Sequence, residues 1–297
     1  MFKPEGIIPA LVTPFDEKGA VDEGALRTLI DNVIDGGCHG IFSLGSNGEF
    51  FSLSATEKLQ IAKVAVDQAQ GRVPVYVGTG CNSTRETIEL TNQMEEIGVS
   101  AVSVITPYFV KHSQDELITH YKNIANETNL PIILYNIPGL TQNALTPETV
   151  AVLSNVDRIV AIKDSSGSFD NVLQYMDAVD NKFSVLVGTD SLILSTLMAG
   201  GSGAIAATAN LLPKTVVSIY EKWKEKDYTG AAQEQLKLGP IRFVFKKGTL
   251  PSVLKEALNQ SGVPVGAPRL PVTSVSAQVE AEIIDIISFY EKNGDIK

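Results

Sequence analysis

Cysteine and histidine are scarce in this chain, and neither has the spacing that is typical of a metal site. The two cysteines, Cys38 and Cys81, lie far apart in the sequence, which fits a reduced compartment. The three histidines are His39, His112 and His120, and they form no H-E-x-x-H or comparable ligand pair near the end of a predicted strand. We therefore expect no metal site.

Long apolar runs, basic runs and two common catalytic motifs are also missing. No segment reaches about 18 apolar residues, and the start of the chain has too short an apolar run and too many prolines for a signal peptide. The net charge of −10, without any Lys/Arg run, argues against nucleic acid as a partner. Neither a P-loop nor a G-x-S-x-G elbow occurs. We expect a cytoplasmic protein with no membrane or nucleic-acid partner.

Short apolar runs do alternate with amphipathic stretches over the first 227 residues. The predicted strands are residues 6–12, 39–44, 73–79, 100–105, 131–136, 159–163, 183–188 and 203–207. The predicted helices begin near Asp22, Ser54, Thr84, Gln114, Thr146, Ser168, Asp190 and Pro213. Strict alternation implies a parallel sheet, and eight such units suffice to close an α/β barrel of the (β/α)₈ (TIM) type. An open doubly wound sheet is the alternative, but no G-x-G-x-x-G follows the first strand.

The last 70 or so residues have a different, purely helical pattern. It covers 229–247, with a break at Gly239-Pro240, then 250–260 and 276–292. No low-complexity linker precedes it. We therefore predict a catalytic barrel at residues 1–227 and a three-helix extension at 228–297 that packs on it.

The most informative stretch is the sixth predicted strand, which ends in Lys163. A lysine at the carboxyl end of a buried parallel strand cannot easily reach water, and burial favours the neutral amine that attacks a ketone. Taken alone, Lys163 is more readily explained as a charged residue that ends a strand and reaches solvent. Its neighbours at the other strand ends decide between the two interpretations.

Two other strand ends carry groups that suit a lysine nucleophile. After the second strand, a glycine-rich turn places Ser46 and Asn47 at the barrel mouth, with backbone N–H groups that would suit a carboxylate. The fifth strand ends with Tyr135, which would lie one strand from the lysine and transfer protons if Ser46 orients it. As single observations, these are a polar turn and a buried tyrosine.

The remaining strand ends offer binding groups. Ser165 follows the lysine by two residues, Gly188 ends the seventh strand with Asp190 two residues on, and Ile205 on the eighth offers a backbone carbonyl. Tyr108, after the fourth strand, suits rim packing or a subunit contact. A lysine, a tyrosine, hydroxyls and a carboxylate cradle together suit imine chemistry on a 2-oxo acid, with the imine as electron sink and no cofactor.

Several motifs in one order resemble the pyruvate-dependent class I aldolase family that includes N-acetylneuraminate lyase and dihydrodipicolinate synthase. They are GIIPALVTPF, GSNGEF, VGTG, ITPYF, YNIPGLT, AIKDSSG, VGTD and GAIAATAN, and they span nearly the whole chain. The resemblance implies a homotetramer built as a dimer of dimers. It also implies that Lys163 forms the Schiff base, Tyr135 transfers protons, Ser46 relays them, Asn47 binds the carboxylate, and Ile205 contributes its carbonyl.

Two departures from the family pattern bear on the reaction. The arginine that binds the second substrate's carboxylate in the synthases is Leu140 here, so an anionic aldehyde would lose its anchor. The rim tyrosine that the family takes from a neighbouring subunit is Phe109 here, so the relay is either shorter or uses Tyr108. Ser165, which carries a hydroxyl, and Asp190 match positions that sugar-acid aldolases use to bind their substrates.

We therefore predict a lyase that splits a 2-keto-3-deoxy sugar acid into pyruvate and an aldehyde, closest to the 2-keto-3-deoxygluconate type. The alternatives are a dihydrodipicolinate synthase that uses aspartate semialdehyde, an N-acetylneuraminate lyase, and a barrel that binds a 2-oxo acid without catalysis.

Overall fold

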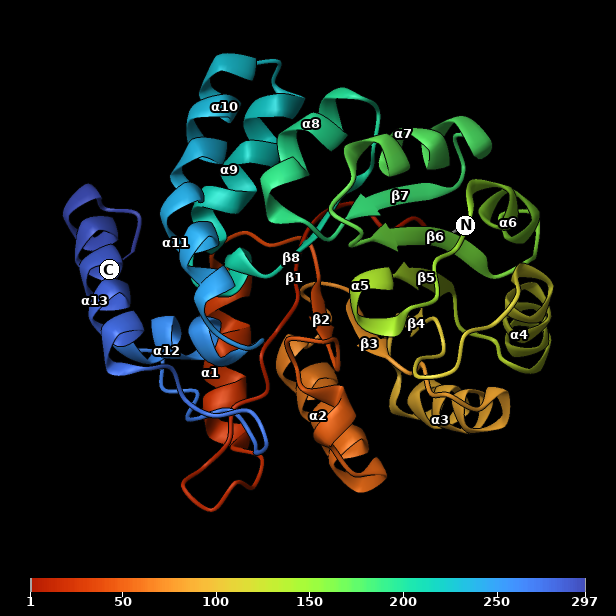
Figure 1. Ribbon diagram of the computed structural model, residues 1–297, viewed down its shortest axis with the longest axis horizontal. Helices are drawn as coiled ribbons and strands as arrows, with labels where there is room; N and C mark the ends of the chain where they lie inside the picture. Colours follow the sequence, from red (N-terminus) through yellow and green to blue (C-terminus); the bar gives the residue numbers. More distant parts are fainter. Residues whose placement is uncertain (1, 297) are drawn as a thin grey trace.

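The computed structural model describes residues 2–296, and eight parallel strands form a barrel at its centre (Figure 1). The strands are β1 (Gly6–Pro9), β2 (Ile41–Ser43), β3 (Val75–Gly78), β4 (Ala101–Ile105), β5 (Ile132–Asn136), β6 (Ile159–Asp164), β7 (Ser184–Val187) and β8 (Gly203–Ala206). Each pairs with its neighbour in sequence from β2 to β8, and β8 pairs with β1. A bridge between Ala10 and Phe42, with Leu11 N–H donating to the Phe42 carbonyl at 2.8 Å, links β1 to β2. The barrel is confirmed, and the open sheet is excluded.

Helices follow the strands and surround the barrel (Figure 1). They are α1 (Glu23–Asp35), α2 (Ala55–Ala69), α3 (Thr84–Ile97), α4 (Gln114–Glu127), α6 (Pro147–Leu153), α7 (Phe169–Ala178), α8 (Ile193–Met198) and α9 (Pro213–Lys224). Local sequence fixes where they begin: the Ser54 hydroxyl accepts from the N–H of Glu57, and the Glu57 carboxylate accepts from the N–H of Ser54. The same capping box opens α4.

The helix predicted to begin near Asp190 starts as η2 (Asp190–Leu192) and continues as α8. Three other short elements at the carboxyl ends of strands were not predicted: η1 (Phe50–Ser52), α5 (Pro138–Thr141) and η3 (Thr208–Asn210). Each has only three or four residues, too few for a hydrophobic period to emerge. They line the face of the barrel where the candidate site lies.

Side chains fill the barrel, so its mouth stands on a packed base. Alternate residues of the strands point inward and form one apolar cluster, which includes Ile8, Ala10, Phe42, Tyr76, Ala101, Ile133, Ala161, Leu186 and Ile205. The other strand faces pack against the helices in a second, larger cluster. Because each buried aliphatic or aromatic side chain contributes about 1.5–3 kcal/mol, these layers hold the strand ends in fixed positions.

The C-terminal helices lie together at one side of the barrel, at the left in Figure 1. They are α10 (Tyr228–Lys237), α11 (Gly239–Val244), η4 (Phe245–Lys247), α12 (Ser252–Gln260) and α13 (Ala277–Asn293). The predicted break at Gly239-Pro240 separates α10 from α11. Tyr290 of α13 joins both, because its hydroxyl donates to the Lys237 carbonyl at 2.8 Å and accepts from the Ile241 N–H at 3.3 Å. The division between residues 227 and 228 stays a prediction.

Within residues 2–296, no helix combines the length and the apolar character needed to cross a membrane.

Candidate active site

Lys163 lies near the carboxyl end of β6 and points into the barrel mouth. Lys163 pairs with Tyr135 in the register of β5 and β6, and only 4% of Lys163 is exposed. The Lys163 Nζ lies 4.1 Å from the ring centroid of Tyr135 and 5.0 Å from that of Phe42. The structure therefore brings the amine and the phenol together in a largely dry, aromatic environment.

Ser46 completes this group from the turn after β2. Its Oγ lies 3.3 Å from the Tyr135 Oη, and either hydroxyl can donate. The turn is tight because Leu44 has a left-handed φ of 60° and because Gly45 lies against a ring: a Cβ there would be 2.6 Å from Phe42 Cε1. Lys163 of β6, Tyr135 of β5 and Ser46 of the turn after β2 therefore lie next to one another in this order.

Asn47 is half-buried, and its neighbours partly correct the predicted carboxylate cradle. Two N–H groups that were expected to face the mouth donate inside the turn instead, Gly48 to the Gly45 carbonyl at 3.0 Å and Glu49 to the Ser46 carbonyl at 3.2 Å. The Asn47 Oδ1 is buried without a hydrogen-bond partner among residues 2–296. A buried amide oxygen of this kind is costly unless a donor meets it. The amide, more than the turn's backbone, is the group open to a ligand.

Gly188 and Ser165 lie beside the lysine. A Cβ at Gly188 would be 2.0 Å from Ser165 Oγ and 2.8 Å from Lys163 Cε, so only glycine leaves both side chains where they are. Ser165 is held through its backbone, because its N–H donates to the Asn136 carbonyl at 2.8 Å. Both residues shape the space around the amine.

Asp190 has a different position from the one predicted. It is 1% exposed, and its carboxylate accepts from the N–H of Ala207 at 3.2 Å and from the N–H of Thr208 at 2.7 Å. Its carboxylate therefore braces the turn after β8 instead of facing open space where substrate hydroxyls would lie. The side chain of Ile205 packs in the barrel interior, which leaves only its backbone for the mouth.

The rim residues differ in exposure: Tyr108 is half-buried, whereas Phe109 and Leu140 are exposed. Tyr108 is half-buried, with its ring centroid 6.2 Å from that of Phe50, and burial raises the pKa of its phenol. Phe109 is 88% exposed and has a φ of 79°, which is rare for a residue with a side chain. Leu140, on α5, is 59% exposed.

The sequence did not point to the polar pair behind the lysine. Asn136 and Asp164 follow Tyr135 and Lys163, so they point outward, and Asn136 Nδ2 donates to Asp164 Oδ1 at 2.7 Å. Asp164 also accepts from Ser166 Oγ at 2.6 Å. Burial raises the pKa of Asp164, against these hydrogen bonds. The pair could have been predicted, because Asn136 and Asp164 are polar residues at the matching ends of two adjacent strands.

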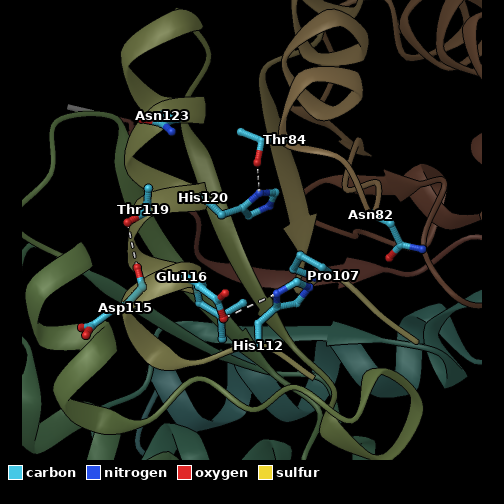
Figure 2. A pocket seen from close by; sticks show the side chains of 10 residues that line it. Asn82, Thr84, Pro107, His112, Asp115, Glu116, Thr119, His120 and Asn123 are labelled. Carbon is cyan, nitrogen blue, oxygen red and sulfur yellow. Dashed lines mark hydrogen bonds and ion pairs between the residues drawn. The ribbon is translucent and has the colours of Figure 1, made fainter. Parts of the chain in front are cut away.

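A groove of about 380 Å³ between α3 and α4 is separate from this site (Figure 2). Its lining includes Asn82, Thr84, His112, Glu116 and His120, and it contains none of the predicted site residues. His120 Nδ1 lies 2.8 Å from Thr84 Oγ1, and burial lowers the pKa of this imidazole to about 4. Within residues 2–296, no three His, Cys, Asp or Glu side chains are grouped to hold a metal ion.

Comparison with known proteins agrees with this geometry. A profile described as the dihydrodipicolinate synthetase family matches residues 3–289. The chain is 38% identical to a 4-hydroxy-tetrahydrodipicolinate synthase of Methanopyrus kandleri, over 91% of each chain. It is 36% identical to the Bacillus subtilis protein of that name, over 94% of this chain and 97% of the other.

Solved structures give the same result. YagE of E. coli K12, described as a prophage protein of the dihydrodipicolinic acid synthase family in complex with pyruvate, superposes with a TM-score of 0.93. It is 35% identical, and the match covers 97% of this chain and 98% of YagE. The chain therefore belongs to the dihydrodipicolinate synthetase family and is an enzyme of its pyruvate-dependent, Schiff-base-forming aldolase class.

Proposed function

We propose that Lys163 forms the imine and that Tyr135 and Ser46 carry the protons of the reaction. The observation that carries this proposal is the buried Lys163 Nζ, 4.1 Å from the centroid of a tyrosine ring whose hydroxyl lies 3.3 Å from Ser46 Oγ. A buried amine next to a positioned acid/base is the arrangement that carbinolamine formation and dehydration require.

The proposed cleavage begins when the Lys163 amine adds to the C2 carbonyl of a sugar acid. The C2 oxygen then leaves as water after it receives a proton through Tyr135. The protonated imine withdraws electrons from the C3–C4 bond, and Tyr135, relayed by Ser46, accepts the proton of the C4 hydroxyl as that bond breaks. An aldehyde departs, and protonation and hydrolysis of the remaining enamine release pyruvate and the free amine.

Binding of the 2-oxo acid falls to the groups around this centre. The half-buried Asn47 amide is the proposed contact for the carboxylate end, to which its N–H groups would donate, while its unpartnered Oδ1 would accept from a donor of the substrate. The backbone of Ile205 is the proposed contact from β8, and Ser165 and Gly188 shape the wall beside the lysine. We assign Asp190 a positioning role, because its carboxylate already binds two backbone N–H groups.

For the second substrate, we propose an uncharged polyhydroxy aldehyde, so that the reaction is cleavage of a 2-keto-3-deoxy sugar acid. Leu140 supports this choice: it is apolar and 59% exposed on α5, and it cannot form an ion pair with a carboxylate.

The second candidate is the synthase reaction with aspartate semialdehyde. The relatives from Methanopyrus kandleri and Bacillus subtilis carry the synthase name at 38% and 36% identity, and these names favour the synthase over the cleavage. The two candidates share the Lys163 imine and differ in the aldehyde and in whether the carbon–carbon bond is broken or formed.

A substrate panel separates the two candidates. Pyruvate formation is measured from 2-keto-3-deoxygluconate, N-acetylneuraminate and 4-hydroxy-2-oxoglutarate, beside pyruvate consumption with aspartate semialdehyde. We expect the highest kcat/KM with 2-keto-3-deoxygluconate. Efficient consumption of pyruvate with aspartate semialdehyde, together with no cleavage of any sugar acid, would replace our proposal with the synthase. Activity with any of these four substrates would exclude the hypothesis that the barrel binds a 2-oxo acid without catalysis.

We also propose a homotetramer built as a dimer of dimers. Phe109 and the neighbouring Val110 are 88% and 55% exposed at the rim, which suits a contact with a second copy. Mass measurement by light scattering tests it, and a monomer at micromolar concentration would contradict it. The cytoplasmic location stays a prediction.

A further inference from the structure

The turn that carries Ser46 and Asn47 ends in a charged residue with no access to water. Glu49 is 0% exposed and has a left-handed φ of 55°. Its Oε1 lies 2.9 Å from the Nζ of Lys255, which is also 0% exposed and comes from α12 of the C-terminal extension. A fully buried ion pair therefore joins the extension to the proposed active-site turn.

Each charge of this pair has further partners. Lys255 Nζ donates to the Ala267 carbonyl at 3.0 Å and lies 4.2 Å from the ring centroid of Phe15. Glu49 Oε2 accepts from the backbone N–H of Arg269 at 2.8 Å. Burial lowers the pKa of Lys255, and the attraction to Glu49 opposes this effect. Groups of the extension thus meet both carboxylate oxygens, Oε2 through a hydrogen bond and Oε1 through the charge of Lys255, whose geometry is not that of a hydrogen bond.

Arg269 makes a second attachment on the same side. Its guanidinium binds both carboxylate oxygens of Glu57, at 3.1 and 2.6 Å, and donates to the Ser52 carbonyl at 2.9 Å. This attachment reaches the start of α2, which follows the turn and η1. A bidentate arginine fixes direction as well as distance, so the segment from Glu49 to Glu57 has little freedom.

The other side of the turn is fixed by the barrel. Thr13 Oγ1, in the loop after β1, donates to the Gly48 carbonyl at 2.7 Å, and both groups are buried. The turn therefore lies between the β1 loop and the C-terminal extension. Its catalytic end, Ser46, must reach the Tyr135 hydroxyl from this position.

Stability alone is a weak reason for such a pair. A buried ion pair often stabilises a fold no more than apolar residues of the same volume would, because both charges lose their hydration. What the pair does provide is a fixed distance and direction, and the group that it fixes is three residues from Ser46.

We propose that Glu49 and Lys255 are positioning residues, which hold the Ser46–Asn47 turn at the distance from Tyr135 that proton transfer requires. This inference rests on the proposed function. It gives the extension a role in the geometry of the active site, through its contacts with this turn.

The test uses the double variant Glu49→Gln/Lys255→Met, in which no charge is left buried without a partner. We expect a folded protein whose kcat is about 10- to 100-fold lower, because small displacements of catalytic groups have effects of this size. The matched control is Lys247→Met, which breaks the exposed ion pair to Glu282 within the extension and should retain the wild-type kcat.

Combination with Ser46→Ala separates positioning from general damage. If Glu49 and Lys255 act through Ser46, the double variant should lower kcat much less in the Ser46→Ala background than in the wild type. Equal losses in the two backgrounds, a wild-type kcat in the double variant, or failure of the double variant to fold would each overturn the inference.

Before the variants are compared, the wild-type protein is treated with pyruvate and borohydride, and formation of the covalent adduct is measured. A wild type that forms no adduct overturns the proposed function and this inference with it. A wild type that is trapped, with a double variant of unchanged kcat, overturns the inference alone.

Discussion

Replacement of Gly188 by alanine is the substitution whose effect the structure specifies most closely. The added Cβ would lie 2.0 Å from Ser165 Oγ and 2.8 Å from Lys163 Cε, both far inside contact distance. Since Gly188 has no left-handed φ, the backbone itself tolerates alanine, and the whole effect is steric. Ser165 must rotate, and Lys163 must shift by a large fraction of an ångström.

The magnitude follows from these overlaps. Overpacking of a filled site destabilises a protein by about 1–3 kcal/mol. For a chain of this size, that lowers the thermal midpoint by only a few degrees. Displacement of the reacting amine costs far more in rate, about 100-fold for an ångström. We therefore expect Gly188→Ala to fold, with kcat/KM lowered about 100-fold.

The assay compares kcat/KM and the thermal midpoint with those of Gly24→Ala as control. Gly24 is exposed in α1, and an added Cβ there would meet only Asp22 Oδ1 at 3.4 Å, an ordinary contact. The control should keep full activity and its midpoint. If Gly188→Ala retains more than half of the wild-type kcat/KM, the amine is not where our account needs it.

Three further predictions concern the relay, the second substrate and pH. Tyr135→Phe should lower kcat by about 10²–10⁴-fold with little change in pyruvate affinity, and equal losses in both would assign Tyr135 to binding. Leu140→Arg should raise kcat/KM with aspartate semialdehyde relative to 2-keto-3-deoxygluconate, and an unchanged ratio would show that this position does not select the aldehyde. Burial lowers the pKa of His120 from 6.5 to about 4, so only the unfolded state takes up this proton between those values. The free energy of unfolding should fall by up to about 3 kcal/mol as the pH drops from 6.5 to 4, and urea titrations of His120→Gln should show a shallower fall.

The sequence was sufficient for the barrel and for the meeting of Lys163 with Tyr135. Both follow from regular patterns in the sequence. Residues that point inward alternate with residues that point outward along each strand, and the carboxyl ends of parallel strands lie on one face of the barrel. The helix start near Ser54 was equally predictable, because its capping box lies within four consecutive residues.

What the sequence could not give depends on contacts between distant segments. Asp190 looked like a substrate contact because it matches a position that sugar-acid aldolases use, but its partners, Ala207 and Thr208, come from the turn after the next strand. Likewise, no residue near Glu49 in the sequence indicates that Glu49 pairs with Lys255. Buried polar pairs of this kind have no period, so only the folded chain identifies them.

The most direct test is borohydride reduction in the presence of pyruvate, followed by peptide mass spectrometry. We predict a stable adduct of pyruvate on Lys163 and none in a Lys163→Met variant. A wild-type protein that gains no mass under conditions that trap a known aldolase, or an adduct on another lysine, would contradict this prediction.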